Sequence, residues 1–243
     1  TIRDGTTLLS VSGEVVGQIN ALSVLTTGGV EFGMPNRVTA NCYFGDGSIT
    51  DIENSAKLGG NIHTKGVLIL SSYLSTLFAK EDEMPLSASI AFEQSYGEVD
   101  GDSASLAELC ALISSLSGVP ILQQYAMTGS VNQFGEVQPV GGVNEKIEGY
   151  FSACKILGLS GNQGVLLPVG NVHNLMLNKE VLDAVKKGRF KIYAIKHVND
   201  ALEILTGKHP GQLQADGQYP ADSAFGLIHQ KFTELRDKEE DEN

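Results

Sequence analysis

The first sixty residues alternate apolar and polar side chains around glycines. Examples are VSGEVVGQINALSVL at 11–25 and RVTANCYF at 37–44. Alternation with a period of two, interrupted by glycine, is typical of half-buried antiparallel strands joined by tight turns. This part of the chain is therefore predicted to form β-hairpins.

Helical spacing first appears further along the chain. Apolar residues at helical intervals, from Val67 to Phe78, predict a helix over 67–79. The preceding glycine-rich segment LGGNIHTKG, which contains His63 and Lys65, is interpreted as a solvated loop. A strand is expected over 87–94.

A second helix is predicted over 103–117, where apolar residues again recur every three or four positions. Asp102 or Ser103 is expected to be its N-cap. Ser105 and Glu108 stand at capping-box spacing, and a Gly-Val-Pro segment follows the helix.

The rest of the chain mixes strands and helices, with βα alternation mainly in its second half, which indicates an α+β fold. The expected elements are strands at 121–131 and 135–140, a helix at 143–157, a strand at 164–169, a helix at 172–187, a strand at 190–195 and a helix at 198–206. We expect one compact domain over 1–207, a C-terminal extension over 208–235 and a disordered acidic tail over 236–243.

Charge argues against a nucleic-acid-binding module. The 17 Lys+Arg and 29 Asp+Glu residues give a formal net charge of −12, and no cluster of cations is present. The longest uncharged stretch, 109–135, is interrupted by serine, glycine, proline and glutamine, which argues against a membrane span. We also find no secretory signal.

Cysteine and histidine positions predict a cytoplasmic protein without a metal site. Cys42, Cys110 and Cys154 are odd in number and widely spaced, as expected for reduced, mostly buried thiols. The five histidines never fall at a ligand spacing such as i and i+4.

Two motifs are hard to explain by structure alone. GDSAS, at 101–105, places Ser103 at the mouth of a helix, where unpaired N–H groups can activate a nucleophile and hold an oxyanion. GGVNEKIEG, at 141–149, opens the helix predicted over 143–157. On a helical wheel Lys146 lies on the apolar stripe that includes Ile147, whereas the other charged residues of that helix lie opposite.

An inward lysine near a helix N-terminus loses hydration and meets an unfavourable helix dipole. Both effects favour the neutral amine, which is a general base. Together, Ser103 and Lys146 therefore match the Ser-Lys form of nucleophilic catalysis. The alternatives are that Ser103 only caps its helix and that Lys146 extends its ammonium to water.

The segments 92–109 (FEQSYGEVDGDSASLAEL) and 127–149 (MTGSVNQFGEVQPVGGVNEKIEG) closely resemble the proteolytic domain of Lon proteases, particularly the Lon-B-like branch that carries GDSAS. The resemblance extends from about residue 5 to residue 207. The motifs occur in the family's order, with Ser103 and Lys146 separated by 43 positions.

The resemblance implies that Ser103 is the nucleophile and Lys146 the general base of a serine endopeptidase. It implies that Thr128 hydrogen-bonds and orients the lysine, and that backbone N–H groups of Ser103 and a neighbour form the oxyanion hole. Asp102 precedes the nucleophile as in Lon-B-like members. Glu93 occupies the position of a histidine in the Lon-A branch, and an outward residue on a strand is an equal interpretation of it.

The resemblance also implies a six-membered homo-oligomeric ring that degrades unfolded or damaged proteins, driven by an upstream AAA+ ATPase module. No GxxxxGK[ST] motif is present in this sequence, so ATP and Mg²⁺ are expected only on such a module and no cofactor is expected here.

Other functions fit less well. The main alternative is a non-proteolytic Lon-like scaffold of a ring-forming ATPase, although such a domain would be expected to lack the serine. A trypsin-like enzyme lacks support because a helix follows the serine and the disulfide cysteines are missing. A small-molecule kinase lacks a convincing phosphate loop.

Overall fold

The computed structural model describes residues 2–79 and 84–242, with side chains as far as Lys238. Its strands are β1 (Glu14–Val15), β2 (Gln18–Thr27), β3 (Val30–Phe44), β4 (Ile49–Asp51), β5 (Leu86–Phe92), β6 (Ile121–Leu122), β7 (Tyr125–Met127), β8 (Ser130–Val131), β9 (Val137–Gln138), β10 (Gly164–Pro168) and β11 (Lys191–Ile195). Its helices are α1 (Ile52–Ser55), α2 (Asn61–Phe78), α3 (Ser105–Ser117), α4 (Val143–Leu157), the 3₁₀ helix η1 (Val169–Asn174), α5 (Lys179–Lys186), α6 (Val198–Thr206) and α7 (Ala224–Glu242).

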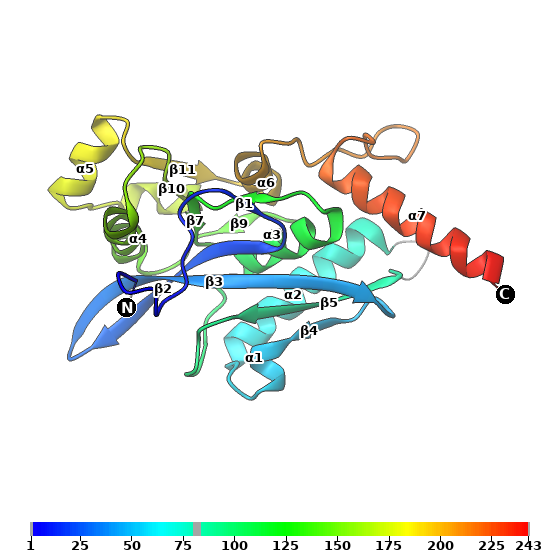
Figure 1. Cartoon of the computed structure of the whole chain (residues 1–243), viewed down its shortest axis with the longest axis horizontal. Helices are drawn as coiled ribbons and strands as arrows, with labels where there is room; N and C mark the ends of the chain where they lie inside the picture. The colour runs from blue at the N-terminus through cyan, green and yellow to red at the C-terminus, as the bar shows by residue number, and fades with distance from the viewer. Residues whose placement is uncertain (1, 80–83, 243) are drawn as a thin grey trace.

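Within the described residues, seven strands form one mixed sheet in the order β11-β10-β7-β2-β3-β5-β4 (Figure 1). The predicted hairpin is confirmed: β2 and β3 pair antiparallel from Gln18↔Thr39 to Thr27↔Val30. Gly28 and Gly29 form its turn with positive φ values of 61° and 80°, which glycine adopts without steric cost. On the other side of β2, strands β7, β10 and β11 all run parallel.

Two apolar cores lie on opposite faces of the parallel part of the sheet. Met127 of β7 and Leu166 of β10 belong to the core that contains α2, α3, α6 and the start of α7. Their neighbours Ala126 and Val165 point the other way, into the core beneath α4 and α5. Because successive side chains of a strand point to opposite faces of the sheet, each of these strands packs against helices on both faces. This arrangement is of the predicted α+β class, and residues of α7, beyond the predicted boundary at 207, belong to the larger core.

Helix α3 contributes many residues to the larger core. Every residue of α3 except Ser117 is buried, including the polar Ser105 and Glu108. The predicted span is therefore nearly right, but the predicted cap is wrong. Ala104 is the N-cap and makes no side-chain cap hydrogen bond. Ser105 instead accepts a hydrogen bond from the N–H of Val131, because β8 packs across the start of the helix.

Helix α2 starts six residues earlier than predicted, so the interpretation of 58–66 as a solvated loop is wrong. Asp100, from the loop after β5, accepts hydrogen bonds from the N–H groups of Ile62 and His63 at 3.1 and 3.2 Å. These donors have no partner within an isolated helix, so a distant carboxylate stabilises the first turn. His63 is buried.

The helix predicted over 172–187 is divided into η1 and α5. The intervening backbone is held extended by α4: Asn144 accepts from the N–H of Met176 at 2.7 Å, and Glu148 accepts from the N–H of Asn178 at 2.7 Å. Asn178 then caps α5 by accepting from the N–H of Val181. The spans predicted for α4 and α6 are confirmed.

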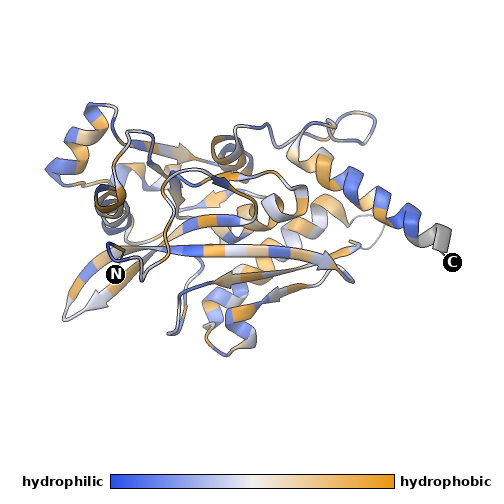
Figure 2. Cartoon of the chain, in the orientation of Figure 1, coloured by the Kyte–Doolittle hydropathy of each residue, from blue (hydrophilic) through white to orange (hydrophobic). Residues whose placement is uncertain are grey.

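The C-terminal segment forms a helix where a disordered tail was expected. Buried Phe225, Ile228 and Phe232 anchor the start of α7 on the core, and polar residues follow along the helix (Figure 2). The backbone of 236–242 continues this helix, because arginine, lysine and glutamate have high helix propensity. Asn243 lies outside the described residues.

Cys42, Cys110 and Cys154 are free thiols, and the latter two are fully buried. Among the helices of the described residues, none has both the length and the apolar character needed to cross a bilayer.

Candidate active site

Three segments that are distant in sequence converge beside the N-terminus of α3. The loop after β5 contributes Ser103, the backbone after β7 contributes Thr128, and the first turn of α4 contributes Lys146. The structure therefore brings together both motifs that the sequence analysis identified.

Ser103 lies one residue before the N-cap of α3, so its hydroxyl does not cap the helix. Gly101 turns the chain just before it with a φ of 94°, a region that disfavours residues with a Cβ. Ser103 is half-buried, and its hydroxyl makes no hydrogen bond within the described part of the chain. The side chain is therefore free to meet a substrate.

Backbone hydrogen bonds fix this loop against the segment after β7. The N–H of Gly129 donates to the carbonyl of Ser103 at 2.8 Å, and the N–H of Leu106 donates to the carbonyl of Gly129 at 3.3 Å. Thr128 in turn donates its N–H to the carbonyl of Leu166 at 3.1 Å, which ties the segment to β10. The sheet thus determines where Ser103 lies.

Lys146 is buried on the inward face of α4, with only 3% of its surface exposed. Its Nζ donates a hydrogen bond to Oγ1 of Thr128 at 3.0 Å. Burial lowers the pKa of Lys146 from 10.5 to about 8, although the negative charge of Asp102 opposes this change. A large fraction of Lys146 is therefore neutral at mildly alkaline pH.

The direction of the hydrogen bonds decides how the amine is oriented. The Thr128 hydroxyl donates to the carbonyl of Ser103 at 3.3 Å, so its oxygen accepts from Lys146. One N–H of a neutral Lys146 is then held by Thr128, and the nitrogen lone pair points elsewhere. No hydrogen bond between Lys146 Nζ and Ser103 Oγ is present among the described residues, and catalytic hydrogen bonds often tighten only when substrate binds.

Backbone donors are available beside the serine hydroxyl. In the described part of the chain, the N–H groups of Ser103 and Ala104 have no protein acceptor. Both lie at the positive end of the α3 dipole. They can therefore bind the oxyanion into which a carbonyl oxygen is converted when a nucleophile attacks the carbonyl carbon.

Close contact between β3 and α4 sets the position of Lys146. A Cβ added at Gly33 would lie 2.0 Å from the carbonyl oxygen of Glu145 and 2.6 Å from Cα of Lys146. A Cβ added at Gly149 would lie 2.1 Å from the carbonyl oxygen of Gly33. Two glycines thus let the strand and the helix touch at the base of the lysine.

We expect Gly33→Ala to lower both stability and activity. The added methyl group pushes α4 from β3, which costs about 1–3 kcal/mol in unfolding free energy and displaces Lys146 from Thr128. Denaturant unfolding and peptide hydrolysis measure the two effects. The control is Gly141→Ala, because a Cβ there meets nothing within 4 Å. Equal behaviour of both variants would contradict the proposed contact.

Glu93 has a different environment from the other predicted site residues. Its carboxylate faces Nη1 of Arg37 at 3.6 Å, and its backbone N–H donates to the carbonyl of Arg37. Among the described residues, no ion pair or hydrogen bond joins it to Ser103 or Lys146. The structure thus does not bring Glu93 into contact with the pair.

Sequence reasoning missed four buried ionisable residues near the loop: Asp51, Glu53, His63 and Glu108. In the described part of the chain, Asp51, Glu53 and His63 form the group that could hold a metal ion, and Oε1 of Glu108 lies 3.9 Å from Nε2 of His63. One sequence signal could have indicated that His63 is buried. His63 stands four residues before Val67, so in a helix extended to include it the two side chains lie on the same face.

A surface hollow of about 540 Å³ lies between α4 and α5, lined by residues that include Phe151 and Lys155. Neither Ser103 nor Lys146 lines it. The hollow has no nucleophile beside a base, so the candidate active site is assigned from side-chain geometry rather than from the size of a cavity.

Comparison with known proteins gives one consistent result. The family description of the Lon protease C-terminal proteolytic domain matches residues 88–207, which include Ser103, Thr128 and Lys146. A Lon protease homolog of Escherichia coli is 54% identical over 200 residues, covering 82% of this chain and 34% of that protein.

Two further relatives extend the similarity. A Lon protease homolog of Haemophilus influenzae is 44% identical over 233 residues, covering 95% of this chain and 39% of that protein. An archaeal Lon protease of Archaeoglobus fulgidus is 29% identical over 211 residues, covering 86% of this chain and 31% of that protein. The chain thus spans about a third of the length of these relatives.

Proposed function

Because the chain belongs to the Lon protease family through its C-terminal proteolytic domain, we propose that it is a serine endopeptidase with a Ser103–Lys146 dyad. Membership of the family implies peptidase activity. The observation that carries the finer assignment is the buried Lys146, whose pKa is lowered. Its amine donates a hydrogen bond to the hydroxyl of Thr128, and that hydroxyl donates to the backbone carbonyl of Ser103.

In the proposed reaction, neutral Lys146 accepts the hydroxyl proton of Ser103 while Oγ attacks the peptide carbonyl carbon. The oxyanion accepts hydrogen bonds from the N–H groups of Ser103 and Ala104. Lys146 then gives the proton to the leaving amine, and an acyl-enzyme remains on Ser103. A water molecule repeats the cycle and releases the second product.

Covalent labelling tests the nucleophile directly. A fluorophosphonate probe reacts with an activated serine hydroxyl, and we expect mass spectrometry of the digested protein to place the adduct on Ser103. The chain has many other serines, including the exposed Ser152, and these serve as internal controls. Labelling spread over several serines, or absent from Ser103, would contradict an activated nucleophile.

Activity is expected to rise with pH, because only neutral Lys146 accepts a proton. The midpoint of kcat/KM should lie near pH 8, the lowered pKa of Lys146. In Asp102→Asn the charge that opposes the lowered pKa is removed, so the midpoint should move to lower pH. The measurement is fluorogenic peptide hydrolysis between about pH 6 and 10.

The control for this shift is Asp222→Asn, which neutralises an exposed carboxylate elsewhere. This variant should keep the wild-type midpoint. A profile that is flat in the wild type, or a midpoint that rises in Asp102→Asn, would argue against Lys146 as the base.

The activity of the whole protein is a wider proposal, because the chain spans about a third of its relatives. We propose that it works in a homo-hexameric ring on unfolded or damaged proteins in the cytoplasm, with ATP and Mg²⁺ bound by an AAA+ module. The free thiols of Cys42, Cys110 and Cys154 support a reducing compartment.

A non-proteolytic scaffold is the alternative. Such a domain has no use for a buried amine with a lowered pKa beside a serine hydroxyl that makes no hydrogen bond in the described part of the chain. These features favour the peptidase.

A further inference from the structure

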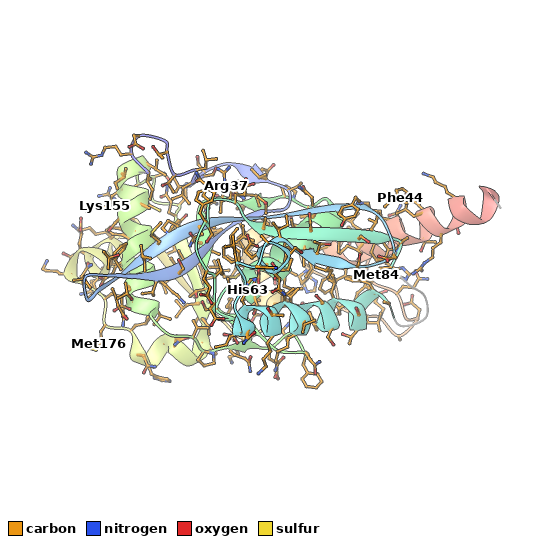
Figure 3. The ribbon with its side chains drawn as sticks, turned by 90° about the horizontal axis from the view of Figure 1, so that it is seen from below. Arg37, Phe44, His63, Met84, Lys155 and Met176 are labelled. Atoms are coloured by element: carbon orange, nitrogen blue, oxygen red, sulfur yellow. The ribbon has the colours of Figure 1, made fainter. Side chains whose placement is uncertain are left out.

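Four buried ionisable side chains lie beside the loop that carries Ser103, and the proposed peptidase mechanism uses none of them. They are Asp51 at the end of β4, Glu53 in α1, His63 in the first turn of α2 and Glu108 in the first turn of α3. Each is exposed to 7% or less. Figure 3 places His63 inside the molecule at the start of α2.

Their polar atoms converge on one point. Asp51, Glu53 and His63 each offer one atom within 4.8 Å of the others. Nε2 of His63 lies 3.0 Å from Oδ2 of Asp51 and 3.9 Å from Oε1 of Glu108. Ligand atoms bound about 2.1 Å from one ion are themselves separated by about 3.0–4.2 Å, so these two distances fit ligands of a shared ion.

The converging atoms also lack hydrogen bonds. Among the described residues, Nε2 of His63 and Oδ2 of Asp51 face each other as an ion pair at 3.0 Å, and neither these two atoms nor Oε2 of Glu53 and Oε1 of Glu108 have a hydrogen-bond partner of good geometry. Buried polar atoms are rarely left in this state. The second oxygen of Glu53 accepts from the N–H of Phe92 at 2.9 Å, so the side chain is anchored while its other oxygen stays free.

Charge points to a cation. When all three carboxylates are ionised, they leave an excess of negative charge even with His63 protonated. Within the described residues, no lysine or arginine pairs with Asp51, Glu53 or Glu108. A buried ion pair needs full compensation, which this group lacks without a further positive charge.

We propose that Asp51, Glu53, His63 and Glu108 bind one divalent transition-metal ion, Zn²⁺ or Mn²⁺. A mixed set of imidazole and carboxylates suits these ions, whereas Ca²⁺ and Mg²⁺ prefer oxygen ligands alone. The ligands come from four elements, so the ion joins β4, α1, α2 and α3.

The site also has a direct connection to the nucleophile loop. The backbone N–H of His63 donates to Asp100 at 3.2 Å, and Asp100 lies three residues before Ser103. Glu108 lies five residues after Ser103, on the helix that the loop enters. The bound ion therefore fixes both sides of the loop. Its role is structural, because protein side chains enclose it.

The test uses the whole chain, stripped with a chelator and dialysed against Zn²⁺ or Mn²⁺. We expect elemental analysis to find one ion per chain after free metal is removed. The unfolding temperature should rise by about 5–10 °C at a free metal concentration about 100-fold above Kd. Glu108→Gln should lose both the ion and the rise, whereas Glu203→Gln, on the exposed face of α6, should keep them.

Glutamine has nearly the shape of a protonated glutamate, so Glu108→Gln is expected to fold without metal, and its metal-free unfolding temperature checks this. His63→Gln gives a second test, with the exposed His173→Gln as its control. The proposal is overturned if the stripped wild type binds no ion and does not respond to Zn²⁺ or Mn²⁺, because the carboxylates then hold protons instead. It is also overturned if both ligand variants bind the ion as the wild type does, or if only Ca²⁺ or Mg²⁺ stabilises the chain.

Discussion

Replacing Ser103 by alanine is expected to reduce peptide hydrolysis about 10⁴-fold or more, because the acyl-enzyme cannot form without the hydroxyl. What remains comes from substrate binding and from the backbone donors of the oxyanion hole. The unfolding free energy should change by no more than about 0.5 kcal/mol, since the half-buried hydroxyl makes no hydrogen bond among the described residues. Steady-state kinetics and denaturant unfolding measure the two quantities.

Ser152→Ala is the matched control for Ser103→Ala. Ser152 is exposed on α4, six residues beyond Lys146, so its loss should change neither activity nor stability. Hydrolysis by Ser103→Ala at a rate close to that of the wild type would exclude Ser103 as the nucleophile. If Ser103→Ala lost activity and also unfolded, the result would indicate a structural role for Ser103 rather than a chemical one.

Replacing Lys146 by methionine is expected to reduce activity strongly and yet stabilise the fold. Loss of the general base should lower kcat/KM by about 10²–10⁴-fold. A decrease in the pKa of Lys146 from 10.5 to about 8 means that its charged form destabilises the folded state by about 3 kcal/mol. Methionine has a similar length and no charge, so at pH 7 the variant should unfold at a higher denaturant concentration than the wild type.

The stability difference should depend on pH in a defined direction. Below about pH 8 Lys146 is protonated in both states, and the folded wild type carries the full cost of the buried charge. Between about pH 8 and 10.5 the unfolded chain binds more protons than the folded chain, so wild-type stability rises with pH. The advantage of Lys146→Met should therefore shrink across this window.

Lys155→Met provides the comparison for Lys146→Met on the same helix. Lys155 is exposed and pairs with Glu180, so its replacement should leave activity intact and cost no more than about 1 kcal/mol at any pH. If Lys146→Met were destabilised at pH 7, or if its advantage did not change with pH, the lowered pKa would be wrong.

The sequence alone predicted the helix that carries the base. The span of α4 and the inward direction of Lys146 follow from residue spacing, because helical periodicity is a property of neighbouring residues. The resemblance of the motifs also placed Thr128 next to Lys146, and the hydrogen bond between them is present. The catalytic roles of these residues, and of Asp102, stay predictions.

Element boundaries failed where distant groups decide them. Asp100 stabilises the first turn of α2 from 37 residues away, so spacing within the helix could not reveal that turn. Asn144 and Glu148 hold the backbone between η1 and α5 out of a helix. The capping-box spacing of Ser105 and Glu108 gave a wrong prediction for the start of α3, because the Ser105 hydroxyl accepts a hydrogen bond from the backbone N–H of Val131 in β8 instead.

Local pattern therefore determined which residues form α4 and why its lysine points inward. Tertiary structure decided that Gly33 and Gly149 allow β3 to touch α4, and that Asp51, Glu53, His63 and Glu108 meet in one buried group. Periodicity reports the preference of a segment for one face of the protein. Contacts between segments depend on the route of the whole chain through the sheet, which no local pattern contains.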